Sequence, residues 1–566
     1  MVSPNLIKRL EDDGGAEVNG DAKKLFQVIF NAKNKHKEEE DDESPKIHVS
    51  SLISRLSFFY EKVRNAVDYD EEHLLRKNAI KRILKRQVVI EGVLKPAKTE
   101  EIANHLLVEL IRGSYLSNDK IPEAKQGEIA AIIAKYMVLK DKCVLKINSE
   151  LSLKTDWKKA RGLFQEKNRL IKTLIALAAC EIEENLGGDK VKQVMVSNMF
   201  NILSRSIKLP PELPYDKDLE IQIYLAISRT FLKFDADMLS LVLFKYYVEA
   251  KELEPAPSKK IVGNLSQLLA TIDYQLSHPL ARQLDKVVQA YSLYFSILAE
   301  TVEPDPAKIF SEIKKNSKSF LNLVRKTCNN KYKKAKGRLW RAATRSIIYI
   351  FFTKSIFVFL IEIPAIHWFG EKINYMALGI NVIFPALLLF FIVFLTQTPG
   401  DKNTDKIVEG VKEIAFVGEE RHQPLILRRP VRRGFIINAI FNLVYAAAFL
   451  VSLFFIIWVL TQVGFNWVSI TIFLFFLAFV SFFSIITTKG VKELIIIDRK
   501  DNLINFLLDL FYMPIISAGR WLSGNVSKIN IFIFIFDFII EAPFKVLLEI
   551  AEDWTRYVRE RKERMS

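Results

Sequence analysis

The fold is decided by residues 435–487, which read FIINAIFNLVYAAAFLVSLFFIIWVLTQVGFNWVSITIFLFFLAFVSFFSIIT. This stretch contains no Asp, Glu, Lys or Arg, and a short turn around Gly464 separates its two apolar runs, 435–463 and 467–487. A helix of about 20 apolar residues crosses the roughly 30 Å of hydrocarbon in a bilayer. The two runs therefore predict a helical hairpin that spans a membrane.

Two more apolar runs of the same kind precede this stretch, at residues 344–366 and 373–396. Four consecutive helices that are apolar on every face are rare in the interior of a soluble protein. Their length and composition instead predict a polytopic α-helical membrane domain over residues 344–490, built from two transmembrane hairpins.

The distribution of Lys and Arg predicts how these hairpins are oriented. The chain of 566 residues has a net charge of +16, and basic residues are dense before the first run, between the second and third, and after the fourth. The other two turns hold only Lys372. Because positive residues stay on the cytoplasmic side, both chain termini are predicted to be cytoplasmic. No apolar signal segment follows Met1, and together with the short outer turns this favours a bacterial inner membrane.

The basic cluster directly before the first run is also a candidate lipid-binding region. Each Lys or Arg near an anionic membrane surface contributes about 1 kcal/mol of attraction. We interpret the cluster both as an orientation signal and as a contact with anionic headgroups. Its members are Lys331, Lys333, Lys334, Lys336, Arg338, Arg341 and Arg345. Aromatic residues are sparse among them, which disfavours nucleic acid as the partner.

Residues 48–343 predict a cytoplasmic all-α domain. Apolar residues recur every four positions, as at Leu219, Ile223 and Ile227, and this spacing lines one face of a helix. Residues that break helices occur where connections are expected: Pro122, Gly187, Gly188, Pro210, Pro211, Pro214, Pro255, Pro257, Pro304 and Pro306. Residues 1–47 contain an acidic run and are predicted to be a flexible segment. The three cysteines show no disulfide or zinc spacing, which fits a reducing compartment.

A short sequence repeat follows each hairpin. Residues 410–414 read GVKEI and residues 490–494 read GVKEL. Each copy leads into an apolar segment with β-branched residues, 415–417 or 495–497. We interpret the repeat as a duplicated unit in which a hairpin is followed by a short cytoplasmic β-strand. The two strands would pair, with residues 424–427 as a third strand. Chance similarity between lysine-rich flanks is the alternative.

Residues 491–566 predict a membrane-associated amphipathic C-terminal region with a basic tail. The segment 503–516 is apolar but short, and 529–550 carries a polar stripe on one helix face. The stripe consists of Asp537, Glu541, Lys545 and Glu549. A charge in the middle of a bilayer costs about 2.5–3.5 kcal/mol, so we expect these helices to lie in the cytoplasmic interface. The alternative is a third transmembrane hairpin with the stripe turned into the bundle.

No catalytic, phosphate-binding or metal-binding motif occurs in the sequence, and no histidines pair at a spacing of four. The sequence therefore predicts neither enzymatic activity nor a cofactor or metal. The candidate functional residues are the intramembrane charges Lys354, Glu362, Asp537, Glu541 and Lys545, because such charges often mark ion or substrate pathways. Alternatively, Lys354 pairs within the bundle or reaches the cytoplasmic interface, and Glu362 reaches the outer interface.

Two functions are consistent with these features. The first is a non-enzymatic, membrane-anchored scaffold whose helical domain is presented to a cytoplasmic protein partner. The second is a channel or transporter subunit that uses Lys354, Glu362 and the 537–549 stripe as a polar path. Because four spans are few for one protomer, the second function requires a homo-oligomer or the third hairpin. Convergence of the charges on a wet cavity would favour transport, and private pairing would favour the scaffold.

Overall fold

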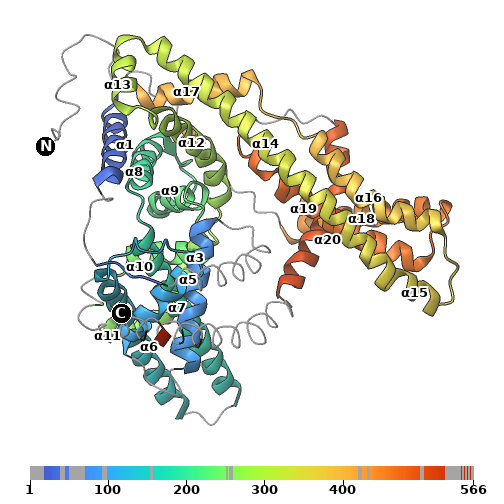
Figure 1. Ribbon diagram of the computed structural model, residues 1–566, viewed down its shortest axis with the longest axis horizontal. Helices are drawn as coiled ribbons and strands as arrows, with labels where there is room; N and C mark the ends of the chain where they lie inside the picture. Colours follow the sequence, from blue (N-terminus) through green and yellow to red (C-terminus); the bar gives the residue numbers. More distant parts are fainter. Residues whose placement is uncertain are drawn as a thin grey trace. The chain divides into compact units, whose positions relative to one another are not determined.

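The computed structural model describes residues 18–38, 45–49, 71–91, 98–152, 157–249, 253, 259–417, 424–429, 434–497, 503–528, 550, 554, 557–558 and 561. Most of these residues are in α-helices, as predicted (Figure 1). Contacts divide the chain into two compact units. The span unit comprises residues 1–26, 289–422 and 429–530, and the helical unit comprises residues 27–288, 423–428 and 531–566. The main boundary between the two units falls after residue 288, inside a helix. The boundary predicted from the sequence, at residue 343, instead marks the change from charged to apolar composition.

The helical unit is built from amphipathic helices around one core. In chain order these are α3 (Glu72–Lys85) with the π-helical turn η2 (Arg86–Glu91), α5 (Thr99–Arg112), α6 (Ala124–Ser152), α7 (Trp157–Gly187), α8 (Lys190–Ser206), α9 (Asp216–Thr230), α10 (Ala236–Tyr247) and α11 (Lys259–Leu276). Helix α7 packs against α3, α6 and α10. The shared core includes Leu106, Leu139, Leu174 and Leu243, which are almost fully buried. Each such leucine contributes about 1.5–3 kcal/mol to stability.

Helix boundaries in this unit follow the breakers in the sequence. Helix α7 ends at Gly187, and Asp189 caps α8 by accepting hydrogen bonds from two backbone N–H groups of its first turn. Asp235 caps α10 by accepting one hydrogen bond, from the backbone N–H of Met238 at 3.1 Å. A cap of this kind contributes about 1 kcal/mol. In α9, Ile223 and Ile227 are fully buried, which confirms the predicted helical face.

The span unit contains the four predicted spans. Its elements are the start of α1 (Gly20–Glu38), the end of α12 (Ala281–Val302), α13 (Pro306–Lys315), α14 (Ser317–Phe357), the π-helical turn η4 (Val358–Glu362), α15 (Ile363–Trp368), α16 (Tyr375–Phe394), α17 (Asp401–Ala415), α18 (Phe435–Gln462), α19 (Trp467–Lys492) and α20 (Leu503–Lys528). Among the described residues, four helices are long and apolar enough to cross a membrane. The first is the continuous helix formed by α14, η4 and α15, and the others are α16, α18 and α19. Only 17% to 39% of their most apolar windows is buried. Exposed apolar surface of this extent is typical of protein that contacts lipid.

Helix α14 begins well before the predicted first span and enters it without a break (Figure 1). Its first part buries Phe320, Val324, Cys328 and Tyr332, which lie four residues apart on one face. This face packs against α13 and α17. Because no proline or glycine pair interrupts the transition from the amphipathic to the apolar part, the helix continues through it.

One asparagine ties together the segments that follow the two hairpins. Asn403, at the start of α17, donates hydrogen bonds to the hydroxyl of Tyr332 at 2.9 Å and to the carbonyl of Leu494 at 2.8 Å. Its Oδ1 accepts a hydrogen bond from the N–H of Ile496 at 2.8 Å. The loop between the second and third spans is thereby fixed both to α14 and to the end of α19.

The predicted pairing of two short strands after the hairpins is wrong. Phe416 forms a single antiparallel bridge with Val18, and residues 495–497 are not in a strand. In the helical unit, β2 (Leu425–Ile426) pairs in parallel with β1 (Ile207–Lys208). The backbone groups of both apolar segments thus find other partners, including Asn403 for the second segment.

The two copies of the sequence repeat also differ in structure. Gly410 lies within α17 against the ring of Tyr294, and a Cβ at this position would be 2.3 Å from a ring carbon. Gly490 lies at the end of α19, and a Cβ there would meet no atom within 4 Å. The repeat therefore does not mark two equivalent structures in the described residues.

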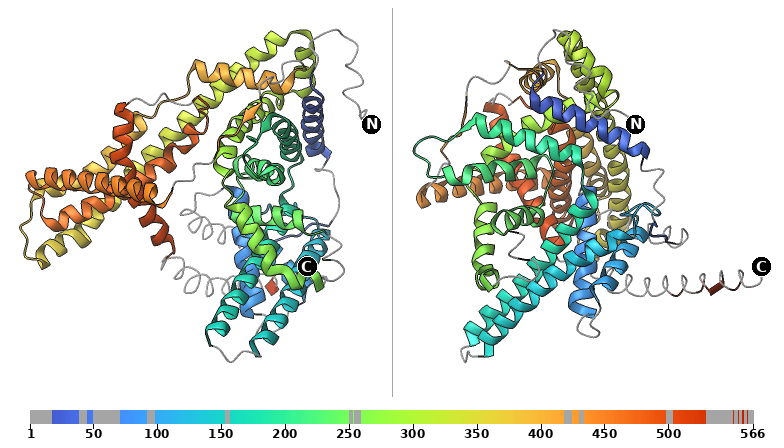
Figure 2. Two further views of the ribbon diagram at one scale, coloured as in Figure 1. Left: turned by 180° about the vertical axis from the view of Figure 1, so that it is seen from behind. Right: turned by 90° about the vertical axis from the view of Figure 1, so that its left-hand side faces the viewer.

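The C-terminal region begins with α20, which runs through Pro514 as one helix. Helix α20 packs against α18 and α19 (Figure 2). Gly519 lies against the backbone of Ala478 in α19, and Ser452 in α18 donates a hydrogen bond to the carbonyl of Phe511 at 3.2 Å. These contacts lie midway along α18 and α19 and not at their ends. For residues 503–528 they favour a position within the bundle over the expected interfacial one. The predicted polar stripe, Asp537, Glu541, Lys545 and Glu549, lies outside the described residues.

Candidate functional site

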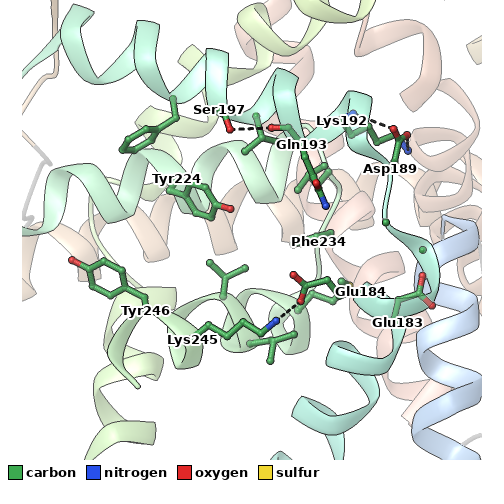
Figure 3. A pocket seen from close by; sticks show the side chains of 18 of the residues that line it. Glu183, Glu184, Asp189, Lys192, Gln193, Ser197, Tyr224, Phe234, Lys245 and Tyr246 are labelled. Carbon is green, nitrogen blue, oxygen red and sulfur yellow. Dashed lines mark hydrogen bonds and ion pairs between the residues drawn. The ribbon is translucent and has the colours of Figure 1, made fainter. Parts of the chain in front are cut away.

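The helical unit contains a pocket of about 590 Å³ between the end of α7 and helices α8, α9 and α10 (Figure 3). Its two ends differ in character. Tyr224 and Tyr246 lie at one end, and Glu183, Asp189 and Lys192 lie at the other. An apolar surface with a few fixed polar groups is the usual composition of a binding pocket.

The turn between α7 and α8 shapes the charged end of this pocket. A side chain at Gly187 would collide with an ion pair, since its Cβ would be 2.8 Å from Nη2 of Arg76 and 3.1 Å from Oε1 of Glu183. Gly187 therefore leaves room for the side chain of Arg76, on α3, to reach Glu183 beside the turn. This local steric requirement explains why glycine occupies position 187.

At the charged end of the pocket, basic residues hold the carboxylates of Glu183 and Glu184 in place. Arg76 donates two hydrogen bonds to Glu183, at 2.7 and 2.8 Å. Lys245 donates to Glu184 at 2.7 Å. The two-point Arg76 contact fixes the orientation of its carboxylate. The polar end consequently offers oriented, largely neutralised groups to a ligand.

His73 also lines the pocket, and its Nε2 is buried without a hydrogen-bond partner. Burial, assisted by the charges of Lys192 and Arg76, lowers the pKa of His73 below 6.5. The folded state then binds fewer protons than the unfolded state, so the stability contributed by this neutral ring decreases as the pH falls below about 6.5.

We therefore expect His73→Gln to make unfolding less sensitive to acid. The stability difference between wild type and variant should change by up to about 1.4 kcal/mol per pH unit between about pH 6.5 and pH 5. Urea unfolding of the full-length protein measures it. Burial raises the pKa of Glu183, so this group makes the folded state more stable as the pH falls, opposite to the effect of His73. The contribution of Glu183 is the same in both proteins and cancels in the difference. A difference that is independent of pH would contradict the expectation.

In the span unit, Lys354 and Glu362 form a buried ion pair. Their side chains are both 0% exposed, and Nζ lies 3.7 Å from Oε2. Oε1 of Glu362 accepts hydrogen bonds from Asn381 of α16 at 2.6 Å and from Ser469 of α19 at 2.7 Å. Lys354 Nζ also lies 3.9 Å from the ring centroid of Phe476 in α19, a favourable cation–π position. Three spans thus meet at one carboxylate.

The π-helical turn η4 makes this pairing possible. In a regular α-helix, two residues eight positions apart point about 80° away from each other. The π-helical turn between Val358 and Glu362 accommodates one additional residue. The two charged residues are then separated as if by seven positions, about 20° from alignment. Pro364 follows directly and lacks an N–H group, so the loosened hydrogen-bond pattern suits the sequence here.

The predicted intramembrane charges thus fall into two groups. Lys354 and Glu362 pair privately within the bundle, which was one of the two interpretations, but Glu362 does not reach an interface. Because neither side chain has accessible surface, no space the size of a water molecule contacts them. Asp537, Glu541 and Lys545 lie outside the described residues.

The seven residues predicted to contact anionic lipid all lie on α14. Lys331 is half-buried and donates hydrogen bonds to Ser296 and Glu300, both at 2.8 Å. It is therefore engaged within the protein. The other six are exposed: Lys333, Lys334, Lys336, Arg338, Arg341 and Arg345.

The three cysteines are buried thiols. Burial raises the pKa of Cys143 and of Cys328 to about 11 and raises that of Cys180 further. At neutral pH all three are protonated and therefore weakly nucleophilic. Among the described residues, no group of three His, Cys, Asp or Glu side chains is arranged to hold a metal ion.

The pocket and two partners of Glu362 were not predicted from the sequence. The pocket is formed by residues distant along the chain, and only the Gly187-Gly188 turn gives a local signal for it. Asn381 and Ser469 carry a clearer signal, since each is a polar residue in an apolar run. Pairing them with Glu362 would have required the relative rotation of three helices.

No family model matches the chain, and comparisons with curated proteins and with solved structures found no significant match.

Proposed function

We propose that this protein is a membrane-anchored scaffold in which the helical unit binds a cytoplasmic protein through the pocket between α7, α8, α9 and α10. The pocket is the observation that carries the proposal. It combines the half-buried Tyr224 and the exposed Tyr246 with oriented charged groups. Tyrosines often contribute most of the binding energy of a protein interface. The described thiols and carboxylates suggest no catalytic chemistry that would compete with binding.

The four candidate spans are the anchor in this proposal. Their flanking Lys and Arg residues support a topology with both termini in the cytoplasm, in a bacterial inner membrane. The described residues near the C-terminus support further contact with the bilayer. Ile550, Trp554, Tyr557 and Val558 are exposed and follow the spacing of one helix face.

The buried ion pair supports an anchor over a transport path. A channel or transporter would use Lys354 and Glu362 where water or substrate can reach them. Both side chains instead have no accessible surface, and the carboxylate is occupied by two hydrogen-bond donors from neighbouring spans.

Site-specific photocrosslinking tests the proposed binding site. A photoreactive phenylalanine analogue at Tyr246, which lines the pocket and is 62% exposed, is expected to capture one specific protein in native membranes. The matched control is the same analogue at Phe164, which is 57% exposed on α7 and does not line the pocket. Mass spectrometry identifies the adducts.

A pocket-filling variant completes this test. Val242 is half-buried in the pocket lining, and Val242→Trp is expected to reduce the adduct at position 246 about tenfold or more, as loss of a central interface contact does. Identical adducts at positions 246 and 164, or an adduct that is unaffected by Val242→Trp, would exclude the pocket as the binding site.

A further inference from the structure

A second, smaller hollow lies on the span unit where α14 and α16 adjoin. Its volume is about 400 Å³, and it lies beside the C-terminal end of α16. Lys336, Leu339 and Trp340 line it from α14, and Phe394, Gln397 and Thr398 line it from the end of α16 and the segment that follows. We call this hollow the α14–α16 groove.

The groove has a polar part and an apolar part. Lys336 supplies a positive charge, and Gln397 and Thr398 supply exposed donors. The buried side chains of Leu339 and Val393 form an apolar floor, and Phe394 is exposed at its edge. Trp340 makes an edge-to-face contact with Phe390 at a centroid distance of 6.1 Å. No carboxylate lines the groove. Its chemistry is therefore complementary to a group that has both a negative charge and a hydrocarbon part.

The groove lies near the end of the basic part of α14. Exposed basic residues occur on both sides of it, including Lys333, Lys334, Arg341 and Arg345. About two to three turns beyond Trp340 the exposed surface becomes apolar, with Tyr349 and Phe352 69% and 61% exposed. In a helix that crosses a bilayer, this transition marks the level of the lipid headgroups. Trp340 has the position of an interfacial aromatic residue.

We propose that the α14–α16 groove binds the phosphate-bearing headgroup of one anionic phospholipid. Lys336 pairs with the phosphate, Gln397 and Thr398 donate hydrogen bonds to headgroup oxygens, and an acyl chain follows the floor toward Phe394. The proposal depends on the insertion of the four spans but not on the protein partner of the helical unit. A free phosphate would satisfy the polar part alone and would leave the apolar floor uncovered.

Native mass spectrometry of the detergent-solubilised full-length protein tests the site with defined lipids. Wild type is expected to retain one phosphatidylglycerol more strongly than phosphatidylcholine. Lys336→Gln is expected to reduce the retained phosphatidylglycerol about fivefold, the factor that corresponds to one interfacial charge. Lys326→Gln is the matched control, since Lys326 is exposed on the same helix about 15 Å before Lys336 and belongs neither to the groove nor to the basic cluster, and it should leave retention unchanged.

Two further measurements distinguish specific binding in the groove from non-specific attraction of anionic lipid to a basic surface. Thr398→Trp fills the groove without changing the charge and should also reduce retention. Inorganic phosphate should not displace the lipid, because it has no chain to cover the floor. Equal losses in the two lysine variants, equal retention of the two lipids, full retention in Thr398→Trp, or displacement by millimolar phosphate would each overturn the proposal.

Discussion

Glu362→Leu is expected to lower the free energy of unfolding of the span unit by about 3–5 kcal/mol, the usual cost of leaving a buried charge without its partner. The Lys354 ammonium would lose its counter-charge at 3.7 Å in a site with no accessible surface. Asn381 and Ser469 would lose the oxygen to which both donate, and unsatisfied buried donors add to the cost.

The double variant Lys354→Met/Glu362→Leu is expected to recover most of this loss, because apolar residues of similar volume often replace a buried ion pair at little cost. Thermal unfolding of the detergent-solubilised full-length protein measures each change. The exposed pair Lys489–Glu493, at 3.8 Å, provides the control. Glu493→Leu should cost 1 kcal/mol or less. Equal effects of the two Glu variants would contradict a special role for the buried pair.

Asp235→Ala is expected to destabilise the helical unit by about 3 kcal/mol. Asp235 caps α10 and also pairs with Lys77, which is 1% exposed. Burial lowers the pKa of Lys77, but its hydrogen bond to Asp235 and the charges of Asp235 and Asp237 outweigh this and raise it overall. Lys77 therefore stays charged and depends on its partners. After the substitution, Asp237 at 3.4 Å is the carboxylate that remains beside Lys77 in the described part of the chain.

Two other variants separate the cap from the ion pair. Asp235→Asn keeps a cap acceptor and should lose only the charge contribution, about 2 kcal/mol. Asp189→Ala removes the cap of α8, where the nearby Lys192 is 58% exposed, and should cost about 1 kcal/mol. Urea unfolding with hydrogen-exchange detection in α10 and α8 measures these values. If Asp235→Ala cost no more than Asp189→Ala, burial of Lys77 would be irrelevant to stability.

The long apolar helices and most helix boundaries were predictable because they depend on local composition. Runs such as 373–396 and 467–487 are long enough to cross a membrane, and helices α16 and α19 coincide with them closely. Helix caps are local in the same way: the side chain of Asp235 caps the helix that begins directly after it. Local signals failed for 415–417 and 495–497, whose β-branched residues suggested strands. Tertiary partners decide those segments, as Asn403 does for Ile496.

The two sites were less predictable because each depends on a departure from regular geometry or on packing between distant segments. In a regular α-helix Lys354 and Glu362 are about 80° apart. The hydrophobic pattern of the sequence does not predict the π-helical turn that aligns them. The pocket of the helical unit depends on how α8 and α9 pack beside α7 and α10. The start of α14 was assigned to the preceding domain because its amphipathic pattern resembles that of a soluble helix.

Because α14 is one uninterrupted helix, a change in its tilt at one end displaces its other end. Its 41 residues extend for about 60 Å. Spans that are too long for their bilayer tilt to fit it, and a rigid rod of this length converts a tilt of about 10° into a displacement of about 10 Å at its far end. Insertion of this helix into a bilayer would therefore couple the thickness of the membrane to the position of Asn316, which caps its N-terminal end.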